Sequence, residues 1–258
     1  MPLERACVMG QVERMIRYEY WNSGAKGIVI GLSGGIDSAV AAVFCCQAIG
    51  ADKVVGFSLP SAISKPVDIH DAAELAKKFG ITHRVVDIDP ILAGFRAMPE
   101  YRDTPYLTGN LMARTRMAVL YYHANRDNLL VCGTSNRSEF MLGYCTKFGD
   151  NSADVQPIVH IYKTEIFEIA RELGIPPAII SKTPSAGLWE GQSDEREIGL
   201  TYPEIDSALA SLEKSGWKPS TPIEEKVLGL VRKSAHKRMP APNLLTGPER
   251  SEGNPPGC

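Results

Sequence analysis

The chain alternates between two kinds of apolar segment, and their lengths predict the elements of the fold. Short segments rich in apolar residues predict strands at 27–32, 53–58, 81–88 and 129–134. Longer segments that are apolar on one side predict helices at 3–20, 37–49, 67–79, 106–125 and 163–173, with a short helix after Pro90. Because strands alternate with helices, we predict an α/β fold with a doubly wound parallel sheet flanked by helices.

The C-terminal half continues this pattern with interruptions. Two glycine-containing segments, 143–156 and 181–199, break the periodicity, and loops of this length inside a compact domain are usually functional. Two more helices are predicted at 202–214 and 223–238. Residues 239–258 contain five prolines and three glycines, and this composition predicts a mostly disordered tail.

The composition of the chain argues against several classes of binding partner and location. The chain has 258 residues, 44% of them hydrophobic, and a formal net charge of −2, so we expect neither nucleic acid nor a membrane surface as a partner. No apolar run approaches the roughly 20 residues that span a bilayer, and the first residues lack a signal-peptide pattern. We expect a cytoplasmic protein with a single domain over residues 1–238. The six cysteines form no C-x-x-C pair and are expected to be reduced thiols.

The most informative motif is the glycine-rich run at 31–38, Gly-Leu-Ser-Gly-Gly-Ile-Asp-Ser. It connects a predicted strand to a predicted helix, where backbone N–H groups and the helix dipole favour a bound anion. Ser33 and Ser38 add hydroxyl donors, whereas Asp37 suits such a site only if a divalent cation lies between carboxylate and phosphate. This pattern points to a magnesium–polyphosphate site, although an ordinary glycine turn with a Ser or Asp cap has a similar composition.

The run differs from the two common phosphate-binding motifs. The chain has no G-x-x-x-x-G-K-[ST], and no G-x-G-x-x-G follows this strand. The run instead resembles the pyrophosphate loop of the ATP-pyrophosphatase (PP-loop) superfamily, whose fold is adenine nucleotide alpha-hydrolase-like. The resemblance implies cleavage of ATP between its α- and β-phosphates and transfer of the adenylyl group to an oxygen of the substrate.

A second polar group follows the strand at 129–134. Because the carboxyl ends of parallel strands meet at one edge of a sheet, Thr134 and Glu139 are expected near the glycine-rich run. Thr134 can hydrogen-bond a nucleotide, and Glu139 can be a second carboxylate ligand beside Asp37. From spacing alone, Glu139 also suits a solvated glutamate at the start of a helix, where the helix dipole favours it.

A wider resemblance covers nearly the whole chain up to Arg238. Gly-Thr-Ser-Asn-Arg-Ser-Glu at 133–139, Lys-Phe-Gly-Asp at 147–150, Lys-Thr-Pro-Ser-Ala-Gly-Leu-Trp at 182–189 and Gly-Gln-Ser-Asp-Glu at 191–195 are similar to motifs of the NAD synthetase family, in the family's order. The resemblance implies ATP-dependent amidation of deamido-NAD to NAD. ATP would adenylylate the nicotinate carboxylate, ammonia would displace AMP, and pyrophosphate would be released.

The resemblance also implies roles for individual residues. Ser185 stands where many relatives have threonine, and both side chains carry a hydroxyl. Magnesium would be held by Asp37 and Glu139. The implied deamido-NAD contacts are Arg114, Lys147, Asp154, His236 and Lys237. The implied ATP contacts are Gly31, Leu32, Ser33, Gly34, Gly35, Ile36, Asp37, Ser38, Thr134, Lys163 and Ser185.

Several residues suit two different roles. Without the resemblance, Arg114 suits a helix-surface salt bridge and Lys147 a solvated loop lysine. Lys163 and Lys182 can offset charge as pyrophosphate leaves. Trp189 suits either an aromatic lid over the adenylate or a hydrophobic anchor.

The alternatives to ammonia-dependent NAD synthesis belong to two classes. One is another PP-loop enzyme of the tRNA-thiolation or GMP-synthetase type, and the other is a nucleotide-binding regulator without turnover. The retained carboxylates Asp37 and Glu139 argue against the regulator. Ammonia is expected as the nitrogen donor because no additional amidohydrolase domain fits before Gly31 or after Arg238. A homodimer is expected from the resemblance alone.

Overall fold

The computed structural model describes residues 2–189 and 191–241. Its centre is a four-stranded sheet in the order β3-β2-β1-β4, and all three strand pairs are parallel. The sheet confirms the predicted parallel α/β architecture. The strands are β1 (Gly27–Gly31), β2 (Val54–Ser58), β3 (Thr82–Val85) and β4 (Leu129–Cys132).

All four strands are shorter than predicted: β1 and β2 by one residue each, β3 at both ends and β4 by two residues. The prediction that the third strand begins at Ile81 is wrong, because the N–H of Ile81 donates to Ala76 O and closes the preceding helix. The fourth strand ends at Cys132 rather than Thr134. After Cys132 the N–H of Gly133 donates to Val155 O at 2.8 Å, so the chain pairs with a loop instead of extending the strand.

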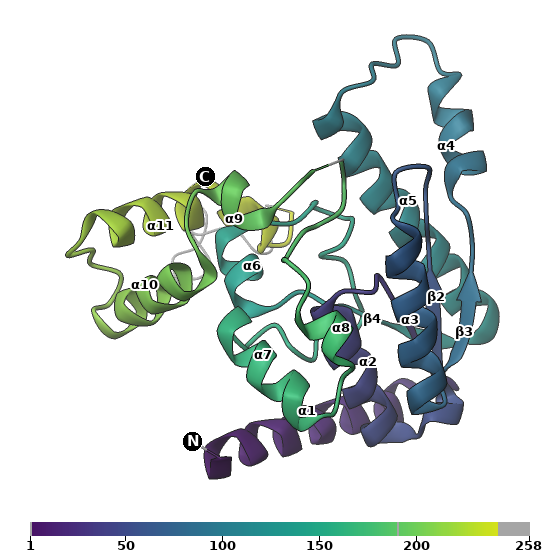
Figure 1. Ribbon diagram of the computed structural model, residues 1–258, viewed down its shortest axis with the longest axis horizontal. Coiled ribbons are helices and arrows are strands. Elements are labelled where there is room, and N and C mark those ends of the chain that lie inside the picture. Colours follow the sequence, from purple (N-terminus) through teal and green to yellow (C-terminus); the bar gives the residue numbers. More distant parts are fainter. Residues whose placement is uncertain (1, 190, 242–258) are drawn as a thin grey trace, which may run out of the picture.

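The helices cover both faces of the sheet and extend beyond it (Figure 1). Three short helices, α6 (Arg137–Leu142), α8 (Pro177–Ile180) and α9 (Asp194–Ile198), lie in regions where the sequence pattern predicts no helix. The prediction of one helix through Arg238 is wrong, because α11 ends at Lys233 and a separate 3₁₀ turn follows Ser234. The helices are α1 (Pro2–Ser23), α2 (Ile36–Ile49), α3 (Pro66–Phe79), α4 (Asp89–Arg96), α5 (Pro105–Asp127), α6 (Arg137–Leu142), α7 (Lys163–Glu172), α8 (Pro177–Ile180), α9 (Asp194–Ile198), α10 (Tyr202–Lys214) and α11 (Pro222–Lys233), with 3₁₀ turns η1 (Ala51–Lys53) and η2 (Ala235–Lys237).

Alternating side chains of β1 divide the core between the two faces of the sheet. Ile28 and Ile30 pack with α1, α2, α3 and α7, whereas Val29 packs with α4 and α5. The chain runs from β1 outward to β3 and then returns through α4 and α5 to β4, on the other side of β1. The strand order therefore reverses between β1 and β4. Ligands of doubly wound sheets bind outside the carboxyl ends of strands at such a point.

A third apolar cluster lies outside the sheet. Buried residues of α6, α10 and α11, such as Leu142, Leu209 and Val227, pack together, and Figure 1 shows α10 and α11 projecting to one side. The side chains of Thr201 and Thr221 cap these two helices. The predicted tail lies outside the described residues from 242 onward, and the single domain over 1–238 stays a prediction. Across the described part of the chain, every helix is too short or too polar to cross a bilayer.

Candidate active site

The glycine-rich run forms a tight turn between β1 and α2, as predicted. Gly34 has φ +75°, and a Cβ atom there would lie 2.3 Å from the Asp68 carbonyl oxygen, so only glycine fits. The Ser33 N–H donates to Ser38 Oγ at 3.3 Å, and Ser38 Oγ donates to Gly35 O at 3.0 Å. Within the described residues no side chain caps the N-terminus of α2. The first N–H groups of α2 are therefore suited to an anion.

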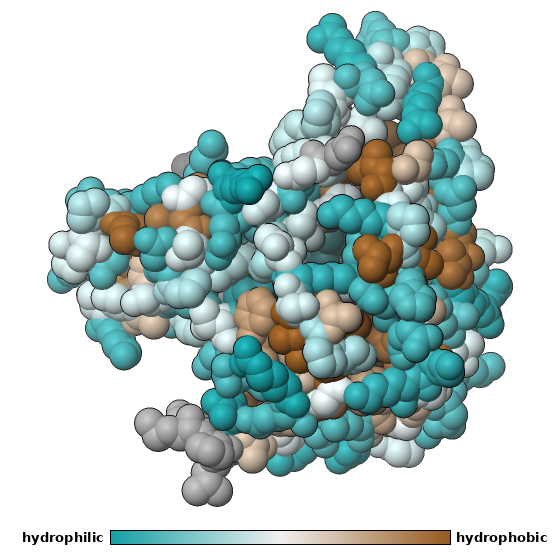
Figure 2. Space-filling model, viewed as in Figure 1, coloured by the Kyte–Doolittle hydropathy of each residue, from teal (hydrophilic) through white to brown (hydrophobic). Residues whose placement is uncertain are grey.

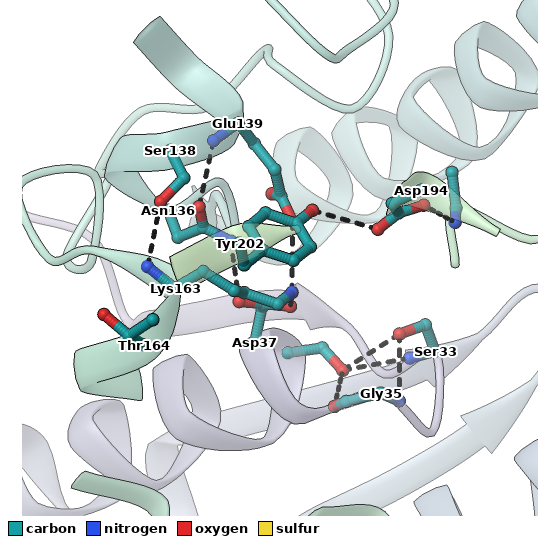
Figure 3. A network of polar contacts seen from close by, with 12 residues as sticks. Ser33, Gly35, Asp37, Asn136, Ser138, Glu139, Lys163, Thr164, Asp194 and Tyr202 are labelled. Carbon is teal, nitrogen blue, oxygen red and sulfur yellow. Dashed lines mark hydrogen bonds and ion pairs between the residues drawn. The ribbon is translucent and has the colours of Figure 1, made fainter. Parts of the chain in front are cut away.

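Lys163 joins the two predicted magnesium ligands. Its Nζ lies 2.5 Å from Asp37 Oδ2 and 3.2 Å from Glu139 Oε1 (Figure 3). The Lys163 side chain is only 2% exposed, whereas the two carboxylates are 19% and 17% exposed. The structure thus brings together three residues that the sequence places in the same site. The ammonium faces inward, and the carboxylates keep access to solvent.

Three helix starts position these side chains. Asp37 is the second residue of α2, and Lys163 is the first residue of α7. Asn136 caps α6 by accepting from the Glu139 N–H at 3.0 Å, and its Nδ2 donates to Asp37 Oδ1 at 2.9 Å. Asn136 therefore connects the end of β4 to the turn after β1, where the strand order reverses.

Lys163 and the carboxylates of Asp37, Glu139 and Asp194 form a charged cluster in which the carboxylates outnumber the cation. Burial raises the pKa of Glu139 to about 7, because the Lys163 ammonium only partly offsets desolvation and the negative charges of Asp37 and Asp194. Burial alone would lower the pKa of Lys163, but Asp37 and Glu139 outweigh it and raise that pKa. Asp37, Glu139 and Asp194 together would carry three negative charges against one positive charge, an imbalance that favours a further cation.

Tyr202 covers the cluster from α10. Its ring lies over the Lys163 ammonium, with Nζ 5.2 Å from the ring centroid. Its hydroxyl donates to Asp194 Oδ2 at 3.0 Å and lies 3.5 Å from Glu139 Oε1. Burial and the neighbouring carboxylates raise the pKa of Tyr202, so the phenol stays protonated and acts as a donor.

The predicted dinucleotide-binding residues fall into two groups. The Arg114 Nε donates to Lys147 O at 3.2 Å, and Lys147 Nζ donates to His236 O at 2.7 Å. Lys237 binds the carbonyls of Gly143 and Cys145 at 2.8 and 2.6 Å. These contacts join α5, the loop after α6 and η2 into one cationic group.

Asp154 lies apart from this chain of contacts. It accepts from the Tyr121 hydroxyl at 3.2 Å and from the Val131 N–H at 2.8 Å, beside β4. Burial, together with the charge of Asp154, raises the pKa of Tyr121 to about 12. The Tyr121 hydroxyl therefore stays a hydrogen-bond donor that fixes this carboxylate.

The remaining predicted residues lie at the ends of β4 and α8. Thr134 is half-buried just after β4. Ser185 lies in the loop before α9, where its hydroxyl donates to Gln192 O at 2.8 Å. Lys182 binds Gly34 O at 3.0 Å and Asp68 and Asp71 at 2.6 Å each. Because two carboxylates already match its charge, Lys182 fastens this loop to the turn after β1.

Trp189 is half-buried in that loop and lines a cavity of about 370 Å³ with Ser61, Met112 and Leu188 among its neighbours. The loop packs closely on α5, since a Cβ at Gly109 would lie 2.9 Å from Leu188 Cβ. Figure 2 shows a hollow in the middle of this face of the molecule, with mainly hydrophilic residues around it. Both readings of Trp189, lid and anchor, stay predictions.

Sequence reasoning missed three residues of the cluster: Asn136, Asp194 and Tyr202. The pair Asn136 and Glu139 carries a readable signal, because Asn followed three residues later by Glu is a common helix start. Tyr202 gives no such signal, because an aromatic residue on an amphipathic helix resembles a core position. Only the packing of α10 on α6 and α7 reveals its place.

Comparison with known proteins shows which family the chain resembles. The family model described as NAD synthase matches residues 8–241. A Methanoregula boonei protein named NH(3)-dependent NAD(+) synthetase is 65% identical over 248 residues, covering 96% of this chain and 100% of the relative.

Two solved structures have similar folds. The NMN synthetase from Francisella tularensis has a TM-score of 0.84 at 38% identity, covering 94% of this chain and 98% of that one. The NH3-dependent NAD synthetase from Campylobacter jejuni has a TM-score of 0.78 at 31% identity, covering 92% and 98%. On the family model and the identity to its relatives, the chain belongs to the NAD synthase family.

Proposed function

We propose that this chain is an ammonia-dependent NAD synthetase, a ligase that forms a C–N bond. ATP adenylylates the nicotinate carboxylate of deamido-NAD, pyrophosphate leaves, and ammonia then displaces AMP to give NAD. The observation that carries the proposal is the cluster of Asp37, Glu139 and Lys163 beside the turn after β1. Membership of the NAD synthase family and the names of its relatives support it.

The glycine-rich turn accounts for ATP binding in this proposal. The N–H groups at the start of α2 and the Ser33 hydroxyl are donors for the β- and γ-phosphates, while Ser38 holds the turn by donating to Gly35 O. The nicotinate oxygen attacks the α-phosphorus, the bond to the β-phosphate oxygen breaks, and that oxygen carries the electron pair away with pyrophosphate. We infer that the buried Lys163 ammonium, which holds Asp37 and Glu139, contributes positive charge near the negative charge that develops there.

The donor set suits magnesium. Mg²⁺ binds through one or two carboxylates together with phosphate oxygens and water, and Asp37 and Glu139 are two partly exposed carboxylates beside an anion site. The excess negative charge around Lys163 would be matched by a divalent ion. When bound, Mg²⁺ supplies Lewis-acid stabilisation of the departing pyrophosphate.

The second substrate has two phosphates and a carboxylate, so it needs cationic partners. We infer that Arg114, Lys147, His236 and Lys237 bind deamido-NAD, with Asp154 at a neighbouring position. The connected positions of Arg114, Lys147 and η2 support this assignment, because one extended anionic ligand can contact all of them.

The likeness to the NMN synthetase favours a second candidate substrate. That structure is more similar to this chain than the Campylobacter jejuni structure, by both TM-score and identity. The same two-step chemistry on a nicotinate mononucleotide would yield NMN. The choice of acceptor, dinucleotide or mononucleotide, then depends on whether the cationic group around Arg114 binds the second nucleotide, which only the dinucleotide has.

One assay separates these functions. Purified protein with ATP, Mg²⁺ and ammonium chloride is supplied with deamido-NAD, with nicotinate mononucleotide or with neither, and AMP, pyrophosphate and amide product are quantified by chromatography. Deamido-NAD is expected to give equal amounts of AMP, pyrophosphate and NAD. Turnover confined to the mononucleotide would support the second candidate, and ADP with orthophosphate would refute both.

Two further expectations remain proposals. We propose a homodimer. The aromatic side chains of Tyr18 and Trp21 on α1 and of Tyr122 on α5 are exposed, as residues of a protein–protein interface are in an isolated subunit. Light scattering after gel filtration tests it, and a monomeric mass would contradict it. A cytoplasmic location is likewise proposed and is tested by cell fractionation.

A further inference from the structure

A buried carboxylate outside the cluster holds two of its helices. Asp206 lies on α10 and is 6% exposed. Its Oδ2 accepts from the Thr164 N–H at 2.9 Å and from Thr164 Oγ1 at 2.8 Å, and its Oδ1 accepts from Ser138 Oγ. Ser138 Oγ in turn accepts from the Lys163 N–H at 2.9 Å. Asp206 therefore accepts three hydrogen bonds. It also orients the Ser138 hydroxyl, whose oxygen accepts a fourth from the Lys163 N–H.

These donors lie at the starts of the two helices that carry the reactive groups. Ser138 precedes Glu139 in the first turn of α6, and Thr164 follows Lys163 in the first turn of α7. Free N–H groups at a helix N-terminus favour a negative charge. Asp206 thus fixes the backbone on which both Glu139 and Lys163 depend.

The other contacts of α10 reinforce this arrangement. Tyr202 precedes Asp206 by one helical turn, so the two side chains share one face of α10. Figure 3 shows the Tyr202 ring beside the side chains of Lys163 and Glu139. Asp206 holds α6 through the Ser138 hydroxyl and α7 through the Thr164 N–H, while Tyr202 contacts the ends of the Lys163 and Glu139 side chains.

We propose that Asp206 is a positioning residue for the adenylylation step. Acting through Ser138 and Thr164, it sets the separation of the Glu139 carboxylate and the Lys163 ammonium at the ATP site. The inference rests on the proposed function, because it assigns Asp206 to that step. A displacement of about 1 Å in a catalytic group can cost about 100-fold in rate.

The chemistry of Asp206 requires a carboxylate. Both of its oxygens accept, whereas an asparagine offers one acceptor oxygen and a donating NH₂ group. In Asp206→Asn the amide oxygen can keep the two Thr164 donors, but the Ser138 hydroxyl then loses its acceptor. The substitution changes few atoms and breaks one defined link.

The test compares Asp206→Asn, Ser138→Ala and their double variant with wild type. We expect single-turnover pyrophosphate release at saturating substrates to fall about 10- to 100-fold, with KM for ammonia unchanged. The double variant should be no slower than the slower single variant, because both remove the same link. Additive losses, or a folded Asp206→Asn variant within twofold of wild type, would overturn the proposal.

Two controls separate positioning from stability. Glu224 of α11 is equally buried at 6% exposure and accepts from the Ser220 N–H and hydroxyl within its own helical hairpin. Glu224→Gln should lower the melting temperature without changing the release rate. Thr164→Ser, which keeps the hydroxyl, should retain activity that Thr164→Val loses. Equal rate losses for Asp206→Asn and Glu224→Gln would mean that Asp206 is only structural.

A readout independent of activity completes the test. Amide hydrogen exchange of residues 163–166 should accelerate in Asp206→Asn or Ser138→Ala, while exchange in 222–233 stays unchanged. Unchanged exchange at 163–166 would refute the positioning role even if the wild-type protein acts on a different substrate. Absence of pyrophosphate release by wild type with every acceptor would instead refute the proposed function.

Discussion

Lys163 and Asp37 are 126 residues apart in the chain, yet the ammonium and carboxylate lie 2.5 Å from each other. Lys163 starts α7 and Asp37 lies in the first turn of α2, so this ion pair joins two helix N-termini. The first N–H groups of α7 donate to Ser138 and Asp206, whereas the start of α2 has no side-chain cap among the described residues. The ion pair therefore ties the start of α7 to a helix start that is suited to an anion.

Asp37 is expected to be essential for turnover. Asp37→Asn keeps the volume of the side chain but removes its charge, so the partner of Lys163 and one proposed magnesium ligand are both lost. We expect pyrophosphate release to fall by about 100- to 1000-fold with an unchanged circular dichroism spectrum. Asp52→Asn, in η1 at the opposite end of α2, is the matched control and should act as wild type. Near-normal turnover of Asp37→Asn would contradict its assigned role.

Removal of the Lys163 charge is expected to destabilise the fold. Lys163→Met leaves Asp37 and Glu139 without their shared cation, a loss of about 3–5 kcal/mol in the free energy of unfolding for a buried pair. In magnesium-free buffer, the double variant Lys163→Met/Glu139→Gln should regain part of that stability, because one uncompensated carboxylate is gone. Urea unfolding curves measure both. A double variant less stable than Lys163→Met would argue against the coupling.

Stability should depend on pH through Glu139. Because folding raises the pKa of this carboxyl from 4.5 to about 7, its favourable contribution is complete below pH 4.5 and is lost as the pH rises through 7. Without metal and nucleotide, Glu139→Gln should therefore gain stability relative to wild type between pH 5 and pH 8. Urea midpoints at several pH values provide the measurement. A difference independent of pH would show that Glu139 ionises normally.

Arg114 is expected to act on the dinucleotide rather than on ATP. Its guanidinium lies on α5 beside the loop that carries Lys147. Arg114→Ala should weaken deamido-NAD binding by about 1.5–3 kcal/mol, the scale of a lost hydrogen bond to a charged group. ATP affinity should change much less. Isothermal calorimetry compares the two ligands, and equal losses for both would refute the assignment.

Free ammonia is expected to be the nitrogen donor. Burial raises the pKa of Cys46 and Cys145 to about 12, and the hydrogen bond to the Cys132 thiol together with burial raises that of Cys45, so these residues disfavour a nucleophilic thiolate. NAD formation with ammonium salts should rise with pH as free ammonia increases. Glutamine alone should give none. Glutamine-supported turnover in ammonia-free buffer, abolished by a single Cys→Ser change, would overturn this expectation.

The local sequence determined the sheet and the glycine-rich turn after β1. Ile28, Val29 and Ile30 are apolar on both sides, as a strand covered on two faces requires. The glycine at position 34 follows from the left-handed turn that connects this strand to α2. Both features depend on neighbours within a few residues, and a linear sequence contains that information.

The tertiary structure alone decided the partners of the charged groups. The short helix α6, with six residues, carries too few positions for a 3.6-residue period to be recognised. Asp206 and Tyr202 occupy one face of α10, and nothing in their local pattern distinguishes that face from an ordinary core face. The contacts of Tyr202 with Lys163 and Glu139, and those of Asp206 with Ser138 and Thr164, arise only when α10 packs across α6 and α7. Long-range packing, which local periodicity does not encode, therefore determines the electrostatics of the site.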